Sequence, residues 1–395
     1  MVNATLLNVT NALVNANNSL VSDTETTFLN NHLGPVLVSF ILPIILAVVI
    51  LIFVVRNVTP IMHFLYANGR IHARSKYMIS KSLLLDLIEA KSLKEFRSLL
   101  RETMYGETLE KTDDSLRSVH VSLEKGYINS IYELIEMAPK KSKPLLDSYL
   151  MFLEVKILKI IYRAKFNKMK LDESFVYPIG NINRNLLKHL LDAETVADIS
   201  VVMTNTIYSK IFEKKYSTLE EFENAIDEFV FNNFVDTIKK TKIYDGNCII
   251  DILNKKIDIY NILALLKFRI RSIEKEKQKN LLVNNKTSLC LRFERLINAE
   301  TLKDFVEEFK GLIYHAPLTK AFEKYEKDNS LAHFENELFR LFKKYVADNE
   351  MAHTLGPYPL FSYLIKRELE LRNLFIISRG IDVGFSTEKI KEMIA

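Results

Sequence analysis

Histidine and cysteine, which often catalyse reactions or bind metals, are few in this 395-residue chain, and the spacing of the residues that could react matches no motif of known chemistry. The eight histidines form no HExxH or other short metal-binding pattern, and GxxxxGK[ST], GxGxxG and GxSxG are all missing from the sequence. The acidic pairs Glu220–Glu221 and Glu307–Glu308 are adjacent in sequence. Neighbouring residues on a helix point about 100° apart, which makes such pairs poor acid–base partners. The sequence therefore predicts no catalytic residue, no cofactor and no metal site.

Cysteine content and charge exclude two further classes of function. Cys248 and Cys290 are 42 positions apart, which matches neither metal nor redox motifs, so we expect buried thiols in a reducing compartment. The net charge is +5, and the first 32 residues carry Asp23 and Glu25 but no Lys or Arg. The mild basic excess is spread over the rest of the chain. This pattern is typical of a soluble surface and does not indicate nucleic-acid binding.

Charged residues do recur in one pattern, in the stretches "LEVKILKIIYRAK" (153–165), "IDIYNILALLKFR" (257–269) and "LELRNLFIISRG" (369–380). Each stretch has an acid followed nine residues later by a base. These pairs are Glu154 and Arg163, Asp258 and Lys267, and Glu370 and Arg379; Asn261 and Asn373 follow the acid by three in two copies. Nine residues turn a helix through about 900°, so the acid and the base face opposite sides. Each must meet another segment, another copy or another protein, or remain a solvated charge.

The elements that position these charges are indicated by a second repeat. It reads "LIEAKSLKEFRSLLRETMY" (87–105), "LLDAETVADISVVMTNTIY" (190–208) and "LINAETLKDFVEEFKGLIY" (296–314). Ala90, Ala193 and Ala299 each precede the closing tyrosine by 15 positions. Two residues after each alanine comes Ser or Thr, with Glu or Asp three further on, which is the pattern of a capping box or a close relative. We expect one helix to end near the alanine and a second to begin at the hydroxyl residue.

The two repeated patterns, the alanine-to-tyrosine stretch and the acid-bearing stretch, occur in the same order three times, which predicts three copies of one unit. Gly (10) and Pro (9) are scarce in the chain, which favours helices. The fold class is therefore all-α, with helical lobes over residues 81–180, 181–285 and 286–395. A unit of about 100 residues can hold its own small core. The three lobes could form a pseudo-threefold assembly or an open row.

A membrane span precedes the units. Residues Leu33 to Val55 are 23 uncharged, mostly apolar positions, about 34 Å as a helix, which is enough to cross the hydrocarbon core. A cleaved signal peptide would have a basic region before its apolar run, and this chain has none there. Residues 56–80 form a basic entry segment that begins at Arg56. The positive-inside rule then places the N-terminus outside and the bulk of the chain on the cytoplasmic face of the cell membrane.

The segment before the span, residues 1–32, is predicted to be an Asn-rich extracytoplasmic tail. It contains three N-x-S/T acceptors for N-glycosylation, at Asn3, Asn8 and Asn17. The alternative is chance occurrence of the motif in a tail rich in Asn, Ser and Thr.

The repeated units resemble a known family. The L-x-x-A-x-[ST]-[LV]-x-[DE]-[FI] unit with its later acidic helix is similar to the C subunit of archaeal-type (A/V-type) ATP synthases, whose counterpart in vacuolar ATPases is called the d subunit. "YANGRIHARSK" (66–76) looks like the entry segment of that family, and residues 356–394 look like its closing segment. The resemblance covers residues 66–395. It departs from the family at Phe375 and Ile157, where a basic residue is usual, and in carrying a transmembrane span.

The resemblance implies an all-helical funnel of three similar lobes that performs no chemistry. Its narrow base would rest on the proteolipid rotor ring, and its mouth would receive the D and F subunits of the central stalk. One copy in the hetero-oligomeric complex would link ring to stalk and transmit torque for proton- or sodium-coupled ATP synthesis, with membrane lipid around the span. The alternatives are a single-span membrane scaffold built from helical repeats, and a membrane-tethered enzyme whose site is assembled from distant residues.

Overall fold

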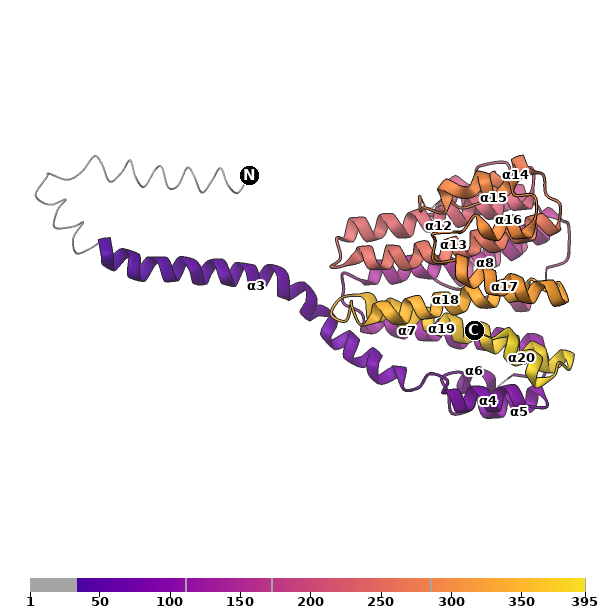
Figure 1. Ribbon diagram of the computed structural model, residues 1–395, viewed down its shortest axis with the longest axis horizontal. Coiled ribbons are helices and arrows are strands. Elements are labelled where there is room, and N and C mark those ends of the chain that lie inside the picture. Colours follow the sequence, from indigo (N-terminus) through magenta and orange to yellow (C-terminus); the bar gives the residue numbers. More distant parts are fainter. Residues whose placement is uncertain (1–33, 111, 172, 285, 395) are drawn as a thin grey trace, which may run out of the picture. The chain divides into compact units, whose positions relative to one another are not determined.

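The computed structural model describes residues 34–110, 112–171, 173–284 and 286–394 (Figure 1). The predicted tail with Asn3, Asn8 and Asn17, and Leu33 at the start of the predicted span, lie outside the described residues. The chain divides into two compact units, residues 1–62 and 63–395. Within the described ranges all regular elements are helices, and the only strand-like pairing is an isolated antiparallel bridge between Ile179 and Ile182. The prediction of an all-α fold is confirmed.

The helices follow one another along the chain in a repeating order of short and long elements. They are α3 (Gly34–Ser75), α4 (Lys81–Glu89), α5 (Leu93–Leu99), α6 (Gly106–Glu110), α7 (Leu116–Met137), α8 (Lys143–Phe166), η2 (Glu173–Phe175), α9 (Arg184–Asp192), α10 (Val196–Met203), α11 (Ser209–Phe212), α12 (Leu219–Thr241), α13 (Gly246–Ile270), α14 (Lys275–Asn280), η3 (Cys290–Arg292), α15 (Phe293–Asn298), α16 (Leu302–Glu307), α17 (His315–Asp328), α18 (Ala332–Glu350), α19 (Tyr358–Val383) and α20 (Thr387–Met393).

Helix α3 contains the apolar stretch. Its window Ser39–Arg56 is the one segment in the described ranges that is long and apolar enough to cross a membrane, and none of that window is buried inside the protein. The helix does not end at Val55 but continues to Ser75, so the basic entry segment begins as part of the same helix. Beyond residue 62 its side chains become buried at Phe64, Ala67 and Ile71. This spacing places the three side chains on one face of the helix, through which the end of α3 joins the core formed by residues 63–395.

The three alanines of the repeat stand at equivalent helix ends. Ala90, Ala193 and Ala299 are the C-caps of α4, α9 and α15, with φ between −59° and −54° and ψ between 130° and 134°. This extended backbone ends each helix. The next helix begins after a hydroxyl N-cap two residues later, as the spacing predicts.

The N-caps differ from the expectation in one detail. Full reciprocal capping boxes form at Thr195 with Asp198 and at Thr301 with Asp304. In the first copy the Glu95 carboxylate accepts the backbone N–H of Lys91, one residue before the N-cap. Asp198 likewise accepts the backbone N–H of Glu194, at 3.2 Å, in addition to the backbone N–H of the N-cap Thr195.

The long helices pack across unit boundaries. Helix α8 packs on α12, α13 packs on α18, and α19 packs on α7. In Figure 1 these long helices run alongside one another, and the short helices α4 to α6 and α14 to α16 lie toward one end of them. The helix that carries the acid of one unit is therefore covered by the long helix of the following unit, and the helix of the last unit is covered by that of the first.

Candidate functional site

The closing tyrosine of each repeat donates a hydrogen bond to the acid of the neighbouring unit. The O–O distances are 2.6 Å from Tyr208 to Glu154, 2.9 Å from Tyr314 to Asp258 and 3.1 Å from Tyr105 to Glu370. All six side chains are buried. The pairing runs from the second unit to the first, from the third to the second, and from the first to the third. We call each contact between a closing tyrosine and the acid of a neighbouring unit a seam, and the three seams form a closed cycle.

Each acid also binds the segment that leads into the next short helix. Glu154 accepts from the backbone N–H and side-chain amide of Asn181, Asp258 from the hydroxyl of Thr287, and Glu370 from the backbone N–H of Ile79. These partners precede the corresponding tyrosine by 27, 27 and 26 residues. The seams are thus built from the same parts, although the partner residues differ in type.

The buried carboxylates differ in how their charge is compensated. Burial raises the pKa of Glu154, and the hydrogen bonds from Tyr208 and Asn181 act in the opposite direction. Burial also raises the pKa of Glu370, against the fully buried Arg367 guanidinium at 2.5 Å. The seam between the last and first units therefore contains the Arg367 cation, whereas the described hydrogen-bond partners of Glu154 are all uncharged.

The bases of the predicted pairs lie on solvent-exposed faces of the same helices, and Lys267 also lines the cavity described below. Arg163, Lys267 and Arg379 are exposed, whereas the acids nine residues earlier are buried. Arg163 forms an ion pair with Glu223 of α12. Acid and base thus face opposite sides, as the helical geometry predicts. Asn373, three residues after Glu370, is buried on α19.

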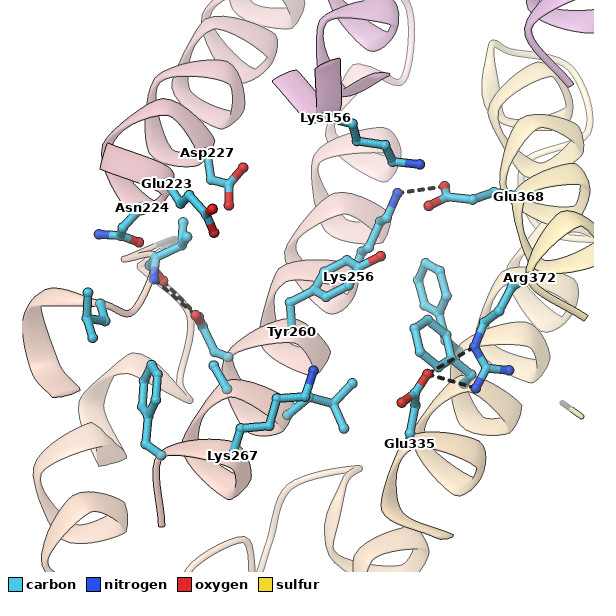
Figure 2. Close-up of a pocket in the computed structure, with 18 of the residues that line it drawn as sticks. Lys156, Glu223, Asn224, Asp227, Lys256, Tyr260, Lys267, Glu335, Glu368 and Arg372 are labelled. Atoms are coloured by element: carbon cyan, nitrogen blue, oxygen red, sulfur yellow. Dashed lines mark hydrogen bonds and ion pairs between the residues drawn. The ribbon is translucent and has the colours of Figure 1, made fainter. Parts of the chain in front are cut away.

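A cavity of about 600 Å³ lies among α8, α12, α13, α18 and α19 (Figure 2). A second cavity of about 260 Å³ shares part of its lining, including Lys156 and Lys256. The three acid-bearing helices contribute to these cavities at the same register, two residues before, two after and five after the acid. The residues are Phe152, Lys156 and Lys159 on α8, Lys256, Tyr260 and Leu263 on α13, and Glu368, Arg372 and Phe375 on α19.

That register explains why the acids and the cavity do not meet. Positions separated by four and then three residues form one stripe along a helix. The acid, two residues from the stripe positions, is rotated by about 200° and points away toward its tyrosine. Each helix thus seals a seam with one face and lines the cavity with the other.

The charges in the cavity are largely matched. Figure 2 shows Lys256 of α13 reaching Glu368 of α19, with Nζ 2.6 Å from Oε2, and Arg372 reaching Glu335 of α18 at 2.9 Å. Burial opposes ionisation of Glu368, but the Lys256 ammonium prevails and lowers the pKa of that carboxyl. Among the described residues that line the larger cavity, none is His, Cys, Ser or Thr. The lining combines charged and apolar side chains, a mixture that is also found in protein–protein interfaces.

The cavity occupies one half of the helical body. Its lining comes from the first third of α12 and the first half of α18, and from the middle and later turns of α13. The hairpin connections between α12 and α13 and between α18 and α19 lie at the other end of these helices. That hairpin end holds the last part of α3, because the Asn68 side-chain amide donates to the backbone oxygens of Thr354 and Gly356.

Sequence reasoning selected the acids but missed the cavity. The residues at the cavity-lining positions differ in type from unit to unit, so no residue type recurs there in the sequence repeats. Only the register relative to the acid could have revealed them. Of the two departures from the family pattern, Phe375 lines the cavity, whereas Ile157 is buried in the core. The two cysteines, expected to be buried, are each half-buried, and neither forms a disulfide.

The chain is similar to one family of known proteins. A family model described as "ATP synthase (C/AC39) subunit" matches residues 67–393. The chain is 24% identical over 361 residues to a Methanocaldococcus jannaschii protein named as the C subunit of an A-type ATP synthase, covering 87% of this chain and 89% of that protein. Proteins of the same name match from Pyrococcus abyssi (25% over 333 residues; 83% and 89% covered) and Methanosphaera stadtmanae (23% over 370 residues; 90% and 94% covered).

Proposed function

The chain belongs to the ATP synthase (C/AC39) subunit family, and from that premise we propose that it is the central-rotor adaptor of an A-type ATP synthase. A subunit of this family is a structural, non-catalytic part of a hetero-oligomeric complex. The adaptor would join the proteolipid ring to the central stalk and transmit torque between them. The family match over residues 67–393 is the observation that carries this proposal.

In this proposal the central cavity receives the foot of the stalk, formed by the D and F subunits. Three helices present equivalent stripes to it, so an elongated partner inserted along the body would contact all three units at once. The lining alternates apolar side chains such as Leu263 and Phe375 with matched ion pairs. The amphipathic helical end of a stalk subunit would fit this mixture. Because it would contact three helices, torque would be transmitted through three separate contacts.

The hairpin end, opposite to the cavity, would face the membrane and the ring. The Asn68 contacts attach this end to α3, whose apolar window Ser39–Arg56 suits a bilayer. The basic flank after the span supports an N-terminus outside and the bulk of the chain in the cytoplasm. The three predicted lobes, residues 81–180, 181–285 and 286–395, would each contain one acid-bearing helix, and the long helices pack across the lobe boundaries, α8 on α12, α13 on α18 and α19 on α7.

The span itself would lie inside the ring. A helix that turns with the ring but lies outside it would meet the stationary ion-channel subunit once in every revolution. The apolar window has no charged residue before Arg56, as expected for a helix among lipid tails and apolar ring walls. The span would then centre and anchor the adaptor without specific polar contacts.

Purification of the tagged chain from native membranes tests the proposal. We expect the proteolipid ring and the stalk subunits to co-purify in fixed stoichiometry. Two tyrosines give a matched pair of variants, because Tyr260 lines the cavity with 48% of its surface exposed and Tyr244 lies between α12 and α13 with 44% exposed. Tyr260→Ala should release the stalk subunits and keep the ring, whereas Tyr244→Ala should keep the stalk. Recovery of the intact chain with neither ring nor stalk would favour the single-span scaffold.

A further inference from the structure

A cluster of metal-binding residue types lies at the hairpin end, away from the central cavity. It consists of Asp245, the N-cap of α13, Cys248 in the first turn of that helix, and His353 between α18 and α19. One donor atom from each residue lies within 4.8 Å of the other two. His353 Nδ1 is 2.5 Å from Asp245 Oδ2, and the Cys248 thiol donates to the Asp245 backbone oxygen at 2.7 Å.

The local backbone brings these side chains together. Asp245 adopts the left-handed conformation, with φ of 53°, which turns the chain sharply into α13. Cys248 follows three residues later and so lies on the same side of the first turn. The imidazole of His353 stacks on the ring of Tyr358, with centroids 5.2 Å apart, which holds it facing the helix start. The cluster borders a cavity of about 260 Å³ that Asp251 and Tyr345 also line.

We propose that Asp245, Cys248 and His353 bind a divalent transition-metal ion of the Zn²⁺ class. A thiolate, an imidazole nitrogen and a carboxylate oxygen are the three donor types that Zn²⁺ takes in proteins, and this combination disfavours Mg²⁺ and Ca²⁺, which prefer oxygen alone. A water molecule or the Asp251 carboxylate in the adjoining cavity would complete a tetrahedron. The thiolate and the carboxylate together neutralise the charge of the ion, and the thiol proton leaves to solvent on binding.

The metal-free geometry is close to what binding needs. Donor atoms around a tetrahedral Zn²⁺ lie about 3.3–3.8 Å apart, given metal–ligand distances near 2.0–2.3 Å. Here the donor atoms all lie within 4.8 Å of one another, and the Asp245 and His353 donors, 2.5 Å apart, are closer than a bound ion allows. The ion would separate that pair and draw in the sulfur. His353 belongs to a connection outside the helices, so side-chain rotation and a small shift of that connection accomplish both.

A bound ion would tie two units together where α3 is attached. It would link the start of α13 to the α18–α19 connection, and the same connection accepts the Asn68 amide at Thr354 and Gly356. Metal occupancy would therefore stiffen the joint that holds the end of α3. This inference does not depend on the proposed rotor function.

Cobalt binding by the full chain in detergent tests the site. Co²⁺ is the probe because a thiolate ligand gives it a near-ultraviolet charge-transfer band and tetrahedral geometry gives it strong visible absorption. We expect one Co²⁺ per chain with both features, displaced by one equivalent of Zn²⁺. Cys248→Ser should abolish the charge-transfer band, and His353→Ala and Asp245→Asn should weaken binding by more than about 100-fold, since the loss of even an outer-shell partner costs 10–100-fold.

The other cysteine provides the control. Cys290 is also half-buried and outside any disulfide, and it does not belong to the cluster, so Cys290→Ser should keep the band and the affinity of the unaltered chain. Helical circular dichroism of every variant checks that the fold is intact, and His353→Ala leaves all helices untouched. Absence of the charge-transfer band in the unaltered chain, or its survival in Cys248→Ser, would overturn the proposal.

Discussion

Replacing Tyr208 with Phe removes the phenolic hydroxyl from one seam and leaves the aromatic side chain in place. The lost contact is a 2.6 Å hydrogen bond to the buried carboxylate of Glu154, which has no cation among its hydrogen-bond partners in the described structure. Hydrogen bonds to charged groups contribute about 1.5–3 kcal/mol, and no cavity larger than the hydroxyl is created. We expect Tyr208→Phe to lower the free energy of unfolding by about 2 kcal/mol at neutral pH.

The same reasoning predicts a smaller loss of stability at the seam between Tyr105 and Glu370. Tyr105→Phe removes a longer contact of 3.1 Å, and Glu370 keeps the Arg367 guanidinium and the Ile79 amide. We therefore expect Tyr105→Phe to lower the free energy of unfolding by only about 1 kcal/mol. Urea unfolding followed by far-ultraviolet circular dichroism measures both, since the chain contains no Trp for fluorescence.

The cost of Tyr208→Phe should depend on pH. The folded pKa of Glu154 is raised by burial, and the Tyr208 hydroxyl opposes that rise. Such a carboxyl adds stability that is complete below its unfolded pKa, about 4.3, and is lost as pH rises through the folded pKa. Without the hydroxyl the folded pKa rises further, so the loss grows. The penalty should be small near about pH 4 and full at neutral pH.

A double-variant cycle identifies the source of the penalty. In the Glu154→Gln background, Tyr208→Phe should cost about 1 kcal/mol or less, because only a neutral hydrogen bond remains. If Tyr208→Phe costs under about 0.5 kcal/mol at neutral pH, or costs the same at both pH values, the seam is not a charge-assisted contact and the reasoning fails.

Other perturbations test other parts of the structure. Thr195→Ala removes a capping box and should lower unfolding free energy by about 1 kcal/mol, while Thr195→Ser should restore it. Gly180→Ala should destabilise the fold more strongly, because φ is 53° there and the new Cβ would lie 1.9 Å from a Glu154 oxygen; an unchanged urea midpoint would contradict the seam geometry. Lys256→Met should raise the pKa of Glu368, so that this variant, unlike the unaltered chain, gains stability as the pH is lowered toward the pKa. Deletion of residues 1–55 should weaken retention on the ring in detergent more than it lowers the melting temperature. The purified chain should hydrolyse no ATP, and activity that persists after removal of contaminating ATPases would count against the proposed role.

Local chemistry made the helix boundaries predictable. A cap is decided within four residues, so the letters around Ala90, Ala193 and Ala299 were enough to locate three helix ends. The apolar stretch before Val55 was equally plain, because hydropathy needs no knowledge of neighbours. Its continuation to Ser75 was not foreseen, since a polar, basic helix has no signal of comparable strength.

Contacts between units could not be read in the same way. Both Tyr208 and Glu154 stand out by recurrence, yet helical periodicity gives the face on which a residue lies and not the element that face meets. The same limit hid the cluster at Asp245, whose partner His353 is 108 residues away. The cavity was missed because equivalent positions, such as Lys156 and Tyr260, share a register without sharing a chemistry.

The cyclic order of the seams has a consequence for synthesis on the ribosome. Tyr105 is made 265 residues before its acceptor Glu370, whereas the other two tyrosines follow their acids by 54 and 56 residues. At 5–20 residues per second the first unit waits roughly 10–50 s for the helix that covers it. During that interval the buried face of α7 has no α19 to pack on. The nascent chain is then a candidate for chaperone binding until translation is almost complete.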